Sequence, residues 1–543
     1  MVLLGVGGIA LAAAVVIGAL ASAGSATVAG PLPNQLIDTA TERGLAVEHS
    51  AFRWGVTGDP VAMMGGGLCW IDVDDDGWLD LFVTDTWSEG EWALWQDEGA
   101  LPTTRLFRND GGNFEDVTEA WGAGFAVRGL GCTVADLEGD GDPDLYVTTS
   151  RANLVLVNTG EAFVEVGAES GAGVYGWQAG AAAGDINGDG LVDLFITGYA
   201  DVNTPRSSDS GFPNTVEARE DLVLLGVGSE ADAPQFEVVE AGEIGVEPDG
   251  PEYGLDVVMA DADGDGDLDV YVANDTQPNR LYRNDFAAGG DFTDISTTAQ
   301  VDDGGSGMGI ATADLNEDHV PDFAVTNLAG QGHGVFLSEG LEGEWANAQG
   351  ALSELGMAET GWGVAFVDLN SDGLLDSIAA SGEIPIVDDT QPLPLSVFQG
   401  TSGGDFEPWE AIANVPNLNG RAVAPADFDN DGDIDLAITS ISGALVLLEN
   451  QLNQGASVLV DAGHAPAGTI VRLHFEDGGT VERQITSGGN WLSAADPRVH
   501  IGYEETRTPA TIDVRYPDGT MISAEVDAAG GIVRLGANET SSQ

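Results

Sequence analysis

The chain contains no lysine, and its 17 basic residues, all arginine, face 90 acidic residues in a total of 543. The formal net charge of −73 excludes proteins that bind nucleic acid through its phosphates, because that binding requires a surface rich in basic residues. Cysteine is scarce too. Cys69 and Cys132 are too few for a disulfide framework and form no CxxC motif.

The two cysteines lie three and four residues before an acidic motif that recurs along the chain. On strands with a period of two, these offsets point the side chains to opposite faces. We therefore expect two buried free thiols, with a bridge between Cys69 and Cys132 as the alternative.

Motifs typical of enzymes are also absent from the sequence. The six histidines show no HExxH or paired spacing, and there is neither a G-x-S-x-G elbow nor a P-loop. We predict no catalytic residues and no organic cofactor, so that an enzyme is the less favoured interpretation.

One long apolar run stands near the start of the chain. Residues 2–22 carry no charge, and the small residues Ala21–Ala23 follow as a cleavage site. The run resembles a secretory signal peptide without its basic region, although about 20 apolar residues could also form an uncleaved membrane anchor. Both alternatives predict a secreted or extracellular protein, or one that is periplasmic or anchored at the cell surface.

An acidic motif recurs seven times. It reads D-x-[DNE]-x-D-x-x-x-D, usually with glycine at position 6, and its copies start 64, 49, 76, 53, 54 and 59 residues apart. Composition alone predicts about half of one such match. We number the copies loops 1–7 and their residues positions 1–9. The loops are DVDDDGWLD from Asp72, DLEGDGDPD from Asp136, DINGDGLVD from Asp185, DADGDGDLD from Asp261, DLNEDHVPD from Asp314, DLNSDGLLD from Asp368 and DFDNDGDID from Asp427.

The spacing predicts a cation in each loop, up to seven Ca²⁺ ions in all. Side chains at positions 1, 3, 5 and 9 converge, position 7 offers its carbonyl, and glycine at position 6 permits the turn. An all-oxygen ligand set with three or four charges favours Ca²⁺ over Mg²⁺ or zinc. The predicted side-chain ligands are Asp72, Asp74, Asp76, Asp80, Asp136, Glu138, Asp140, Asp144, Asp185, Asn187, Asp189, Asp193, Asp261, Asp263, Asp265, Asp269, Asp314, Asn316, Asp318, Asp322, Asp368, Asn370, Asp372, Asp376, Asp427, Asp429, Asp431 and Asp435. The predicted carbonyl ligands are those of Trp78, Asp142, Leu191, Asp267, Val320, Leu374 and Asp433.

Two loops depart from the pattern. Glu138 carries an extra methylene at position 3, and His319 replaces glycine at position 6, where it must adopt a left-handed backbone. We expect these two sites to be the weakest. Solvated acidic turns without metal are the alternative, but random surface acid would not keep the 1-3-5-9 phase.

A four-strand pattern surrounds the loops. A glycine-rich apolar strand precedes each loop and a β-branched strand follows it, with two further strands after that in most copies. Four strands in 50–65 residues is typical of a propeller blade. The seventh copy has no fourth strand after Asn450, and residues 36–45 fit this role. We therefore expect an all-β fold, a seven-bladed β-propeller closed by residues 36–45.

Five segments resemble a known family: VANDTQPNRLYRND (272–285), GMGIATADLNED (307–318), ADFDNDGDIDLAIT (426–439), SGGNWLSAADPRVHIG (487–502) and IDVRYPDGT (512–520). They are similar to the FG-GAP/VCBS repeats of integrin α-subunit heads and bacterial secreted proteins, and most similar to cartilage-acidic-protein-like proteins that end in an ASPIC/UnbV domain. The resemblance covers about residues 36–537. It implies a propeller whose loops bind Ca²⁺ and implies little about activity.

A separate C-terminal domain begins near Ser457, where the acidic loops stop and alternating strands begin. We expect a small β-sandwich-like module. Its longest segment without strands carries Trp491, Asp496, Arg498 and His500, either as a recognition loop or as a packed loop with an Arg–Asp pair. The predicted domains are 1–30 (signal peptide or anchor), 31–451 (propeller), 455–537 (ASPIC/UnbV) and 538–543 (tail).

Two functions remain open. The first is a calcium-binding propeller that acts as a non-catalytic interaction or adhesion module for an unidentified protein or glycan, with membrane contact only through the possible anchor. The second is a glycan-binding or carbohydrate-active lyase or hydrolase that uses the propeller face. Arg206 and Arg219, in the insertion at 199–221, fit either an anionic ligand or surface salt bridges.

Overall fold

The computed structural model describes residues 35–535, except 231–232, 248, 287–288, 341–344, 349, 385–390, 410–414, 416, 453–454 and 527–529. The leader or anchor predicted at 1–30, the tail predicted at 538–543 and the last two residues of the predicted C-terminal domain lie outside the described residues. No helix in the described part of the chain is long and apolar enough to cross a membrane.

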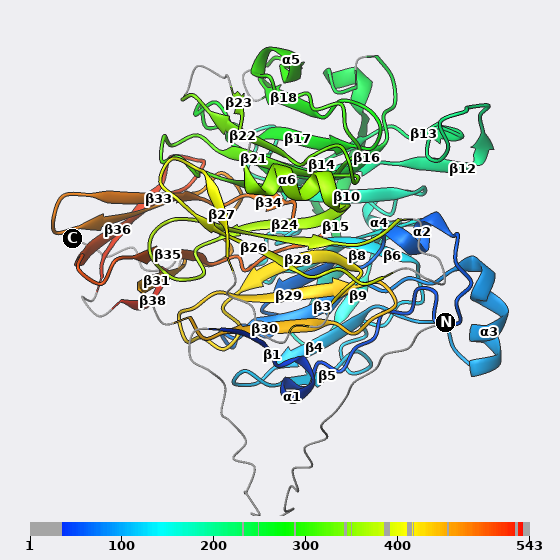
Figure 1. Cartoon of the computed structure of the whole chain (residues 1–543), viewed down its shortest axis with the longest axis horizontal. Helices are drawn as coiled ribbons and strands as arrows, with labels where there is room; N and C mark the ends of the chain where they lie inside the picture. Colours follow the sequence, from blue (N-terminus) through cyan, green and yellow to red (C-terminus); the bar gives the residue numbers. More distant parts are fainter. Residues whose placement is uncertain are drawn as a thin grey trace, which may run out of the picture. The chain divides into compact units, whose positions relative to one another are not determined.

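Seven antiparallel sheets of four strands each follow one another along residues 36–450 (Figure 1). They are β2 (Leu68–Ile71), β3 (Asp80–Val83), β4 (Arg105–Asn109) and β5 (Phe114–Asp116); β6 (Gly129–Ala135), β7 (Asp144–Thr149), β8 (Leu154–Asn158) and β9 (Phe163–Glu165); β10 (Gln178–Gly184), β11 (Asp193–Gly198), β14 (Leu222–Glu230) and β15 (Ala233–Glu240); β16 (Gly254–Ala260), β17 (Asp269–Asn274), β18 (Arg280–Asn284) and β19 (Phe292–Asp294); β20 (Gly307–Ala313), β21 (Asp322–Asn327), β22 (Gly334–Ser338) and β23 (Trp345–Asn347); β24 (Gly361–Val367), β25 (Asp376–Ser381), β26 (Ser396–Gly400) and β27 (Phe406–Pro408); and β28 (Gly420–Ala426), β29 (Asp435–Ser440), β30 (Val446–Asn450) and β1 (Leu36–Asp38).

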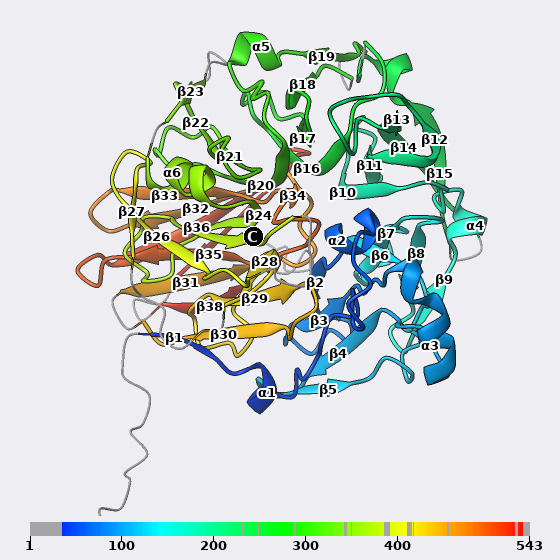
Figure 2. The ribbon, with the colours of Figure 1, turned by 45° about the vertical axis from the view of Figure 1, so that its right-hand side comes forward.

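The sheets close into a ring. The first strands of neighbouring sheets contact one another in chain order, and β28 of the last sheet returns to β2 of the first (Figure 2). This is the all-β propeller that the repeat predicts. Between and beside the sheets lie the hairpin β12 (Ala200–Pro205) and β13 (Val216–Ala218) and short helices: α1 (Ala40–Arg43), α2 (Pro60–Met64), η1 (Glu89–Glu91), α3 (Trp92–Glu98), α4 (Gly167–Ser170), η2 (Ala241–Ile244), α5 (Ser296–Ala299) and α6 (Ala351–Ala358).

Small residues line the ring where first strands meet. A Cβ on Gly309 would lie 2.2 Å from the Trp362 carbonyl oxygen, and one on Gly363 would lie 2.4 Å from that of Arg421, both in the next sheet. Hydroxyl groups join the same strands: Thr148 on β7 accepts from the Gly131 N–H at 3.0 Å and donates to the Ala179 carbonyl of the next sheet at 2.6 Å. The glycine-rich pattern of these strands therefore follows from the close approach of backbones at the ring.

The last sheet contains the N-terminal strand β1, which pairs with β30 in the register Leu36 to Asn450. The strand predicted at 36–45 is shorter than expected, because α1 begins at Ala40. The Asp38 carboxylate accepts the Ala40 N–H at 3.1 Å, and Gly44 ends the helix at φ 99°. The pairing of β1 with β30 therefore spans three residues, and it adds to the contact between β2 and β28 that closes the ring.

The C-terminal strands form two sheets that share one apolar core. They are β35 (Val499–Tyr503), β31 (Ala456–Asp461) and β38 (Gly531–Arg534) in one sheet, and β33 (Thr480–Gln484), β32 (Ile470–Phe475), β36 (Pro509–Arg515) and β37 (Met521–Glu525) in the other. These strands, orange to red in Figure 1, lie beside the propeller strands of loops 6 and 7.

A segment of the C-terminal domain, residues 487–496, enters the ring; we call it the plug segment. It begins with β34 (Ser487–Gly488), which adds a fifth strand to the fourth sheet beside β16. Its contacts reach all seven sheets, through Leu68, Cys132, Ala183, Val257, Ile310, Trp362 and Val423.

Trp491 is the centre of the plug segment and is completely buried, with its ring 4.7 Å from that of Trp362. The buried Asp256 of β16 accepts the N–H groups of Trp491 at 3.2 Å and Leu492 at 3.4 Å. Asn490, Trp491 and Leu492 all have φ between 55° and 61°, a left-handed path that surrounding contacts must hold in place. Of the two alternatives for this segment, the packed loop is confirmed. Asp496 and Arg498 pair at 2.8 Å.

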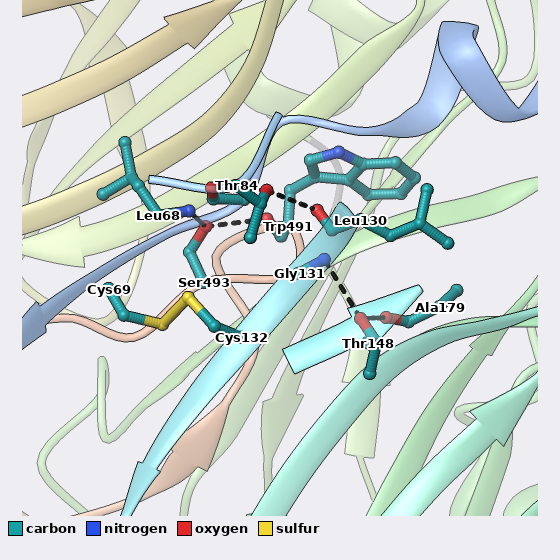
Figure 3. The surroundings of a disulfide bond; sticks show 11 residues. Leu68, Cys69, Thr84, Leu130, Gly131, Cys132, Thr148, Ala179, Trp491 and Ser493 are labelled. Atoms are coloured by element: carbon teal, nitrogen blue, oxygen red, sulfur yellow. Dashed lines mark hydrogen bonds between the residues drawn. A yellow bond between two sulfur atoms is a disulfide. The ribbon is translucent and has the colours of Figure 1, made fainter. Parts of the chain in front are cut away.

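The expectation that the cysteines are free thiols is wrong, because Cys69 and Cys132 form a disulfide with Cα atoms 6.2 Å apart (Figure 3). They lie on β2 and β6, the adjacent first strands of two sheets, beside the plug segment. The two side chains do lie on opposite faces of their sheets, but these faces pack against each other in neighbouring sheets, where both cysteines join one apolar cluster. Their separation of 63 residues is about one repeat, which places both cysteines at neighbouring points of the ring.

Candidate metal centres

Each loop connects the first strand of its sheet to the second, and position 9 opens the second strand. Three hydrogen bonds recur in all seven loops. The position 1 carboxylate accepts the N–H of position 6, the position 5 carboxylate accepts that of position 7, and the position 9 carboxylate accepts that of position 2. These bonds fold each acidic segment into a closed turn before any ion binds.

Acidic ligand atoms gather in the four loops that have an acid at position 3. One oxygen from each of three side chains lies within 4.8 Å of the others in these groups: Asp72, Asp74 and Asp80; Asp136, Glu138 and Asp144; Asp261, Asp263 and Asp265; and Asp427, Asp429 and Asp435. In loops 3, 5 and 6, position 3 is Asn187, Asn316 or Asn370, whose amide oxygen accepts the N–H of position 5. Three acidic oxygens therefore converge in loops 1, 2, 4 and 7, and in loops 3, 5 and 6 position 3 is bonded to position 5 through its amide oxygen.

Buried carboxylate oxygens at position 3 indicate that three of these loops fit a cation. The Asp74 Oδ1, Glu138 Oε2 and Asp429 Oδ1 atoms of loops 1, 2 and 7 are buried without a hydrogen-bond partner. A buried unpartnered carboxylate oxygen is costly unless a positive charge accompanies it. A hard cation at these points would satisfy all three, and the surrounding donors are all oxygen, as Ca²⁺ prefers.

Burial raises the pKa of the position 9 carboxyl groups in all seven loops. Loss of water raises the pKa of Asp80 to about 8 and that of Asp322 to about 7, even though backbone N–H groups that bind them act to lower it. A bound divalent ion favours the charged form of its ligands. Within the described residues no position 9 carboxylate forms a salt bridge, whereas Asp74 and Asp429 at position 3 lie 3.8 Å from Arg108 and 3.4 Å from Arg43.

The two irregular loops keep the common geometry. His319 adopts the left-handed backbone that its place predicts, with φ 70°, and its N–H reaches the Asp314 carboxylate at 2.9 Å. Glu138 lies in the acidic group of loop 2 despite its longer side chain. That these two sites bind most weakly stays a prediction.

An asparagine at the end of the third strand links each of four loops to the neighbouring sheet. Its N–H donates to the position 9 carboxylate of its own sheet, and its side-chain amide donates to the position 2 carbonyl of the preceding loop. The four residues are Asn109, Asn158, Asn284 and Asn450, which donate to the carbonyls of Phe428, Val73, Ile186 and Leu369. Sequence reasoning missed them, although the asparagine that recurs at the end of four third strands was a usable signal.

We expect Asn158→Ala to lower the free energy of unfolding by about 1–3 kcal/mol, because it leaves the buried Val73 carbonyl without its donor at 3.0 Å. Asn113→Ala is the control, since its exposed amide donates only to the nearby Gly111 carbonyl at 3.3 Å. Denaturant titrations in saturating calcium compare the two. Similar losses in both variants would contradict a role for Asn158 between sheets.

Aromatic side chains also gather near the hairpin β12–β13, in the insertion that carries Arg206 and Arg219. Tyr199 and Tyr253 are buried, and their hydroxyls donate to Asp275 at 2.7 Å and to the Val216 carbonyl at 2.7 Å. Arg206 and Arg219 lie 3.5 Å from Glu217 and 3.6 Å from Asp201. The aromatic rings belong to the core, and the arginines form the salt bridges that were one of their two predicted roles.

Two protein families match the sequence. Residues 72–147, 136–196 and 261–325 match the FG-GAP-like repeat, and residues 462–542 match the ASPIC and UnbV family. The repeat matches include loops 1–5. Together the matches bear out the resemblance drawn from the acidic loops and the C-terminal segments.

Curated relatives agree with these matches. Cartilage acidic protein 1 of Xenopus tropicalis is 26% identical over 276 residues, covering 48% of this chain and 41% of that protein. The human protein of the same name is 26% identical over 271 residues, covering 48% of this chain and 40% of that protein. The chain thus spans about two fifths of the length of the curated relatives it matches.

Solved structures are similar at low identity. A lectin of Agrocybe aegerita, described as recognising non-reducing terminal N-acetylglucosamine, is 17% identical with a TM-score of 0.41, covering 65% of this chain and 89% of that chain. BBS1N, solved in complex with ARL6DN, is 12% identical with a TM-score of 0.41, covering 73% of this chain and 96% of that chain.

Proposed function

The chain belongs to the proteins that combine FG-GAP-like repeats with a C-terminal ASPIC and UnbV domain, and from this premise we propose that it is a calcium-binding propeller that acts outside the cytoplasm as a non-catalytic interaction or adhesion module. The observation that carries the proposal is the recurrence of one acidic motif in seven loops, four of which bring three acidic oxygens within 4.8 Å of one another. The side chains at positions 1, 3, 5 and 9, with the carbonyl at position 7, would hold each ion.

Calcium in these loops would act as a structural clamp. When bound, it supplies positive charge to carboxylates that the fold keeps buried and close together. Each loop ties the first two strands of a sheet, and the asparagine at the third strand extends this tie to the neighbouring sheet. Stiff sheets then present the loops on the other face of the ring as an interaction surface.

The disulfide supports a location outside the cytoplasm. A bond between Cys69 and Cys132 persists in oxidising compartments and is rare where thiols are kept reduced. The apolar run at residues 2–22 supports the same location through either a signal peptide or an anchor. The partner, protein or glycan, would bind away from the metal loops.

Calcium binding to the purified chain tests the proposal. After divalent ions are removed and calcium is added back, native mass spectrometry should show several bound ions per chain and up to seven, with magnesium at the same concentration unable to replace them. A chain that binds no calcium would contradict the proposal. Release of shortened oligosaccharides from polyuronides by the calcium-loaded protein would contradict the non-catalytic role and favour the carbohydrate-active alternative.

A further inference from the structure

Loop 6 differs from the other loops in its exposure to solvent. Its ligand residues Asp368, Asn370 and Asp376 have exposed fractions of 2%, 1% and 0%. No residue of loop 6 is exposed, whereas each of the other six loops has at least one exposed residue. In loop 3 the exposed residues run from Gly188 to Leu191. Residues 372–375, which include the predicted ligand residues Asp372 and Leu374, are half-buried, so loop 6 is the least exposed of the seven loops but is not sealed from water.

The C-terminal domain covers loop 6 with its backbone. A Cβ on Gly502 of β35 would lie 2.1 Å from the Asp368 Oδ2 atom and 2.6 Å from the Ser371 Cα atom. A Cβ on Gly455 would lie 1.8 Å from the Ser371 carbonyl oxygen. Two glycines are therefore required where the domain lies on the loop. A side chain at either position would push the domain away from the loop.

An arginine of the same domain holds the cover in place. Arg483, next to the end of β33, is half-buried, and its Nη2 atom donates to the Gly373 carbonyl of loop 6 at 3.5 Å. The plug segment follows a few residues later and fixes the same part of the chain inside the ring. The side of loop 6 formed by Asp368 and Ser371 can thus become open to water only when the domain moves away from the propeller around Gly502.

We propose that the C-terminal domain traps the calcium ion of loop 6, so that this ion exchanges only when the domain lifts from the loop. The inference rests on the proposed calcium binding and adds a kinetic property to one site. Ions in the open loops leave at rates set by their own ligands. The ion in loop 6 leaves at a rate set by a movement of the domain, and a chelator cannot accelerate that movement by attacking the ion.

Chelator-driven release tests the trap. Calcium-loaded protein is mixed in a stopped-flow instrument with a fluorescent calcium chelator, and the released ions are counted in each phase. We expect one ion to leave at least about tenfold more slowly than the fast ions, at a rate independent of chelator concentration. If all ions leave in fast phases that respond to the chelator, the trap is wrong while calcium binding stands. If no calcium is bound at the start, the proposed function itself fails.

A matched pair of variants assigns the slow ion. Asp372 and Asp189 both occupy position 5, and each donates its N–H to position 1 and accepts the N–H of position 7 at 2.9 Å. Asp372→Ala should remove the slow phase, and Asp189→Ala should remove a fast ion. Loss of the slow phase in Asp189→Ala, or its survival in Asp372→Ala, would overturn the assignment to loop 6.

A change in the cover itself gives a test that leaves every ligand in place. Arg483→Gln should accelerate the slow phase severalfold, because the domain loses its contact with Gly373. Arg507→Gln is the control, since this arginine pairs with Asp477 on the exposed side of the C-terminal domain. Removal of positive charge alone would hold calcium more tightly and slow its release. An unchanged or slower phase in Arg483→Gln would therefore contradict the trap.

Discussion

Removal of calcium by EGTA is expected to lower the Tm of the protein by at least about 10 °C. At a free calcium concentration of about one hundred times the Kd, each bound ion adds about 2.7 kcal/mol to the free energy of unfolding. A change of 1 kcal/mol shifts the Tm of a large domain by about 2–4 °C. Several loops contribute at once, because each keeps buried acidic groups that the ion neutralises. Differential scanning calorimetry with and without EGTA measures the shift.

Adding calcium back after EGTA distinguishes the loss of calcium from other effects of the chelator. Calcium added after EGTA should restore the original Tm, and magnesium at the same concentration should restore much less, because it demands a stricter octahedral geometry. A melting curve that EGTA leaves unchanged would show that the loops keep their shape without metal. The hydrogen bonds within each loop would then be sufficient.

Trp491→Ala is expected to lower the free energy of unfolding by about 3–5 kcal/mol. The side chain is fully buried where all seven sheets meet, and its loss leaves a cavity beside the ring of Trp362. The left-handed backbone of residues 490–492 adds to the effect, because this path persists only while the contacts around Trp491 hold it. Thermal or denaturant unfolding in saturating calcium measures the loss.

Trp92→Ala is the matched control. This tryptophan begins α3 and has an exposed fraction of 51%, so its removal should change stability by no more than about 0.5 kcal/mol. Comparable losses in the two variants would show that the plug segment adds little to the stability of the ring.

The loops were predictable from the sequence because their chemistry is local. Nine residues contain the ligands, the turn and the start of the next strand, and their spacing fixes the geometry wherever the loop lies. The strands around them follow from the same repetition. The short length of β1 was not predictable. The Asp38 carboxylate binds the N–H of Ala40, where α1 begins, and this bond competes with pairing between β1 and β30 that exists only in the closed ring.

The plug segment and the disulfide depend on contacts between distant parts of the chain. Cys69 and Cys132 meet only because first strands of adjacent sheets are neighbours, and the opposite faces that simple alternation predicts are the faces that pack against each other. One residue did signal the plug. Five residues before each loop the chain has glycine in five sheets and alanine in the seventh, but Asp256 in the fourth, where it binds the plug segment.

Pairing of β1 with β30 also governs the order of events during synthesis. Leu36 leaves the ribosome more than 400 residues before its partner Asn450 exists, so the first strand waits while six sheets are made. Until Asn450 is made, the ring cannot close. The nascent chain then carries two unpaired strand edges, which can pair with other molecules. Assembly of this protein is consequently a late and cooperative event, in which the two ends of the propeller find each other after nearly all of it has been translated.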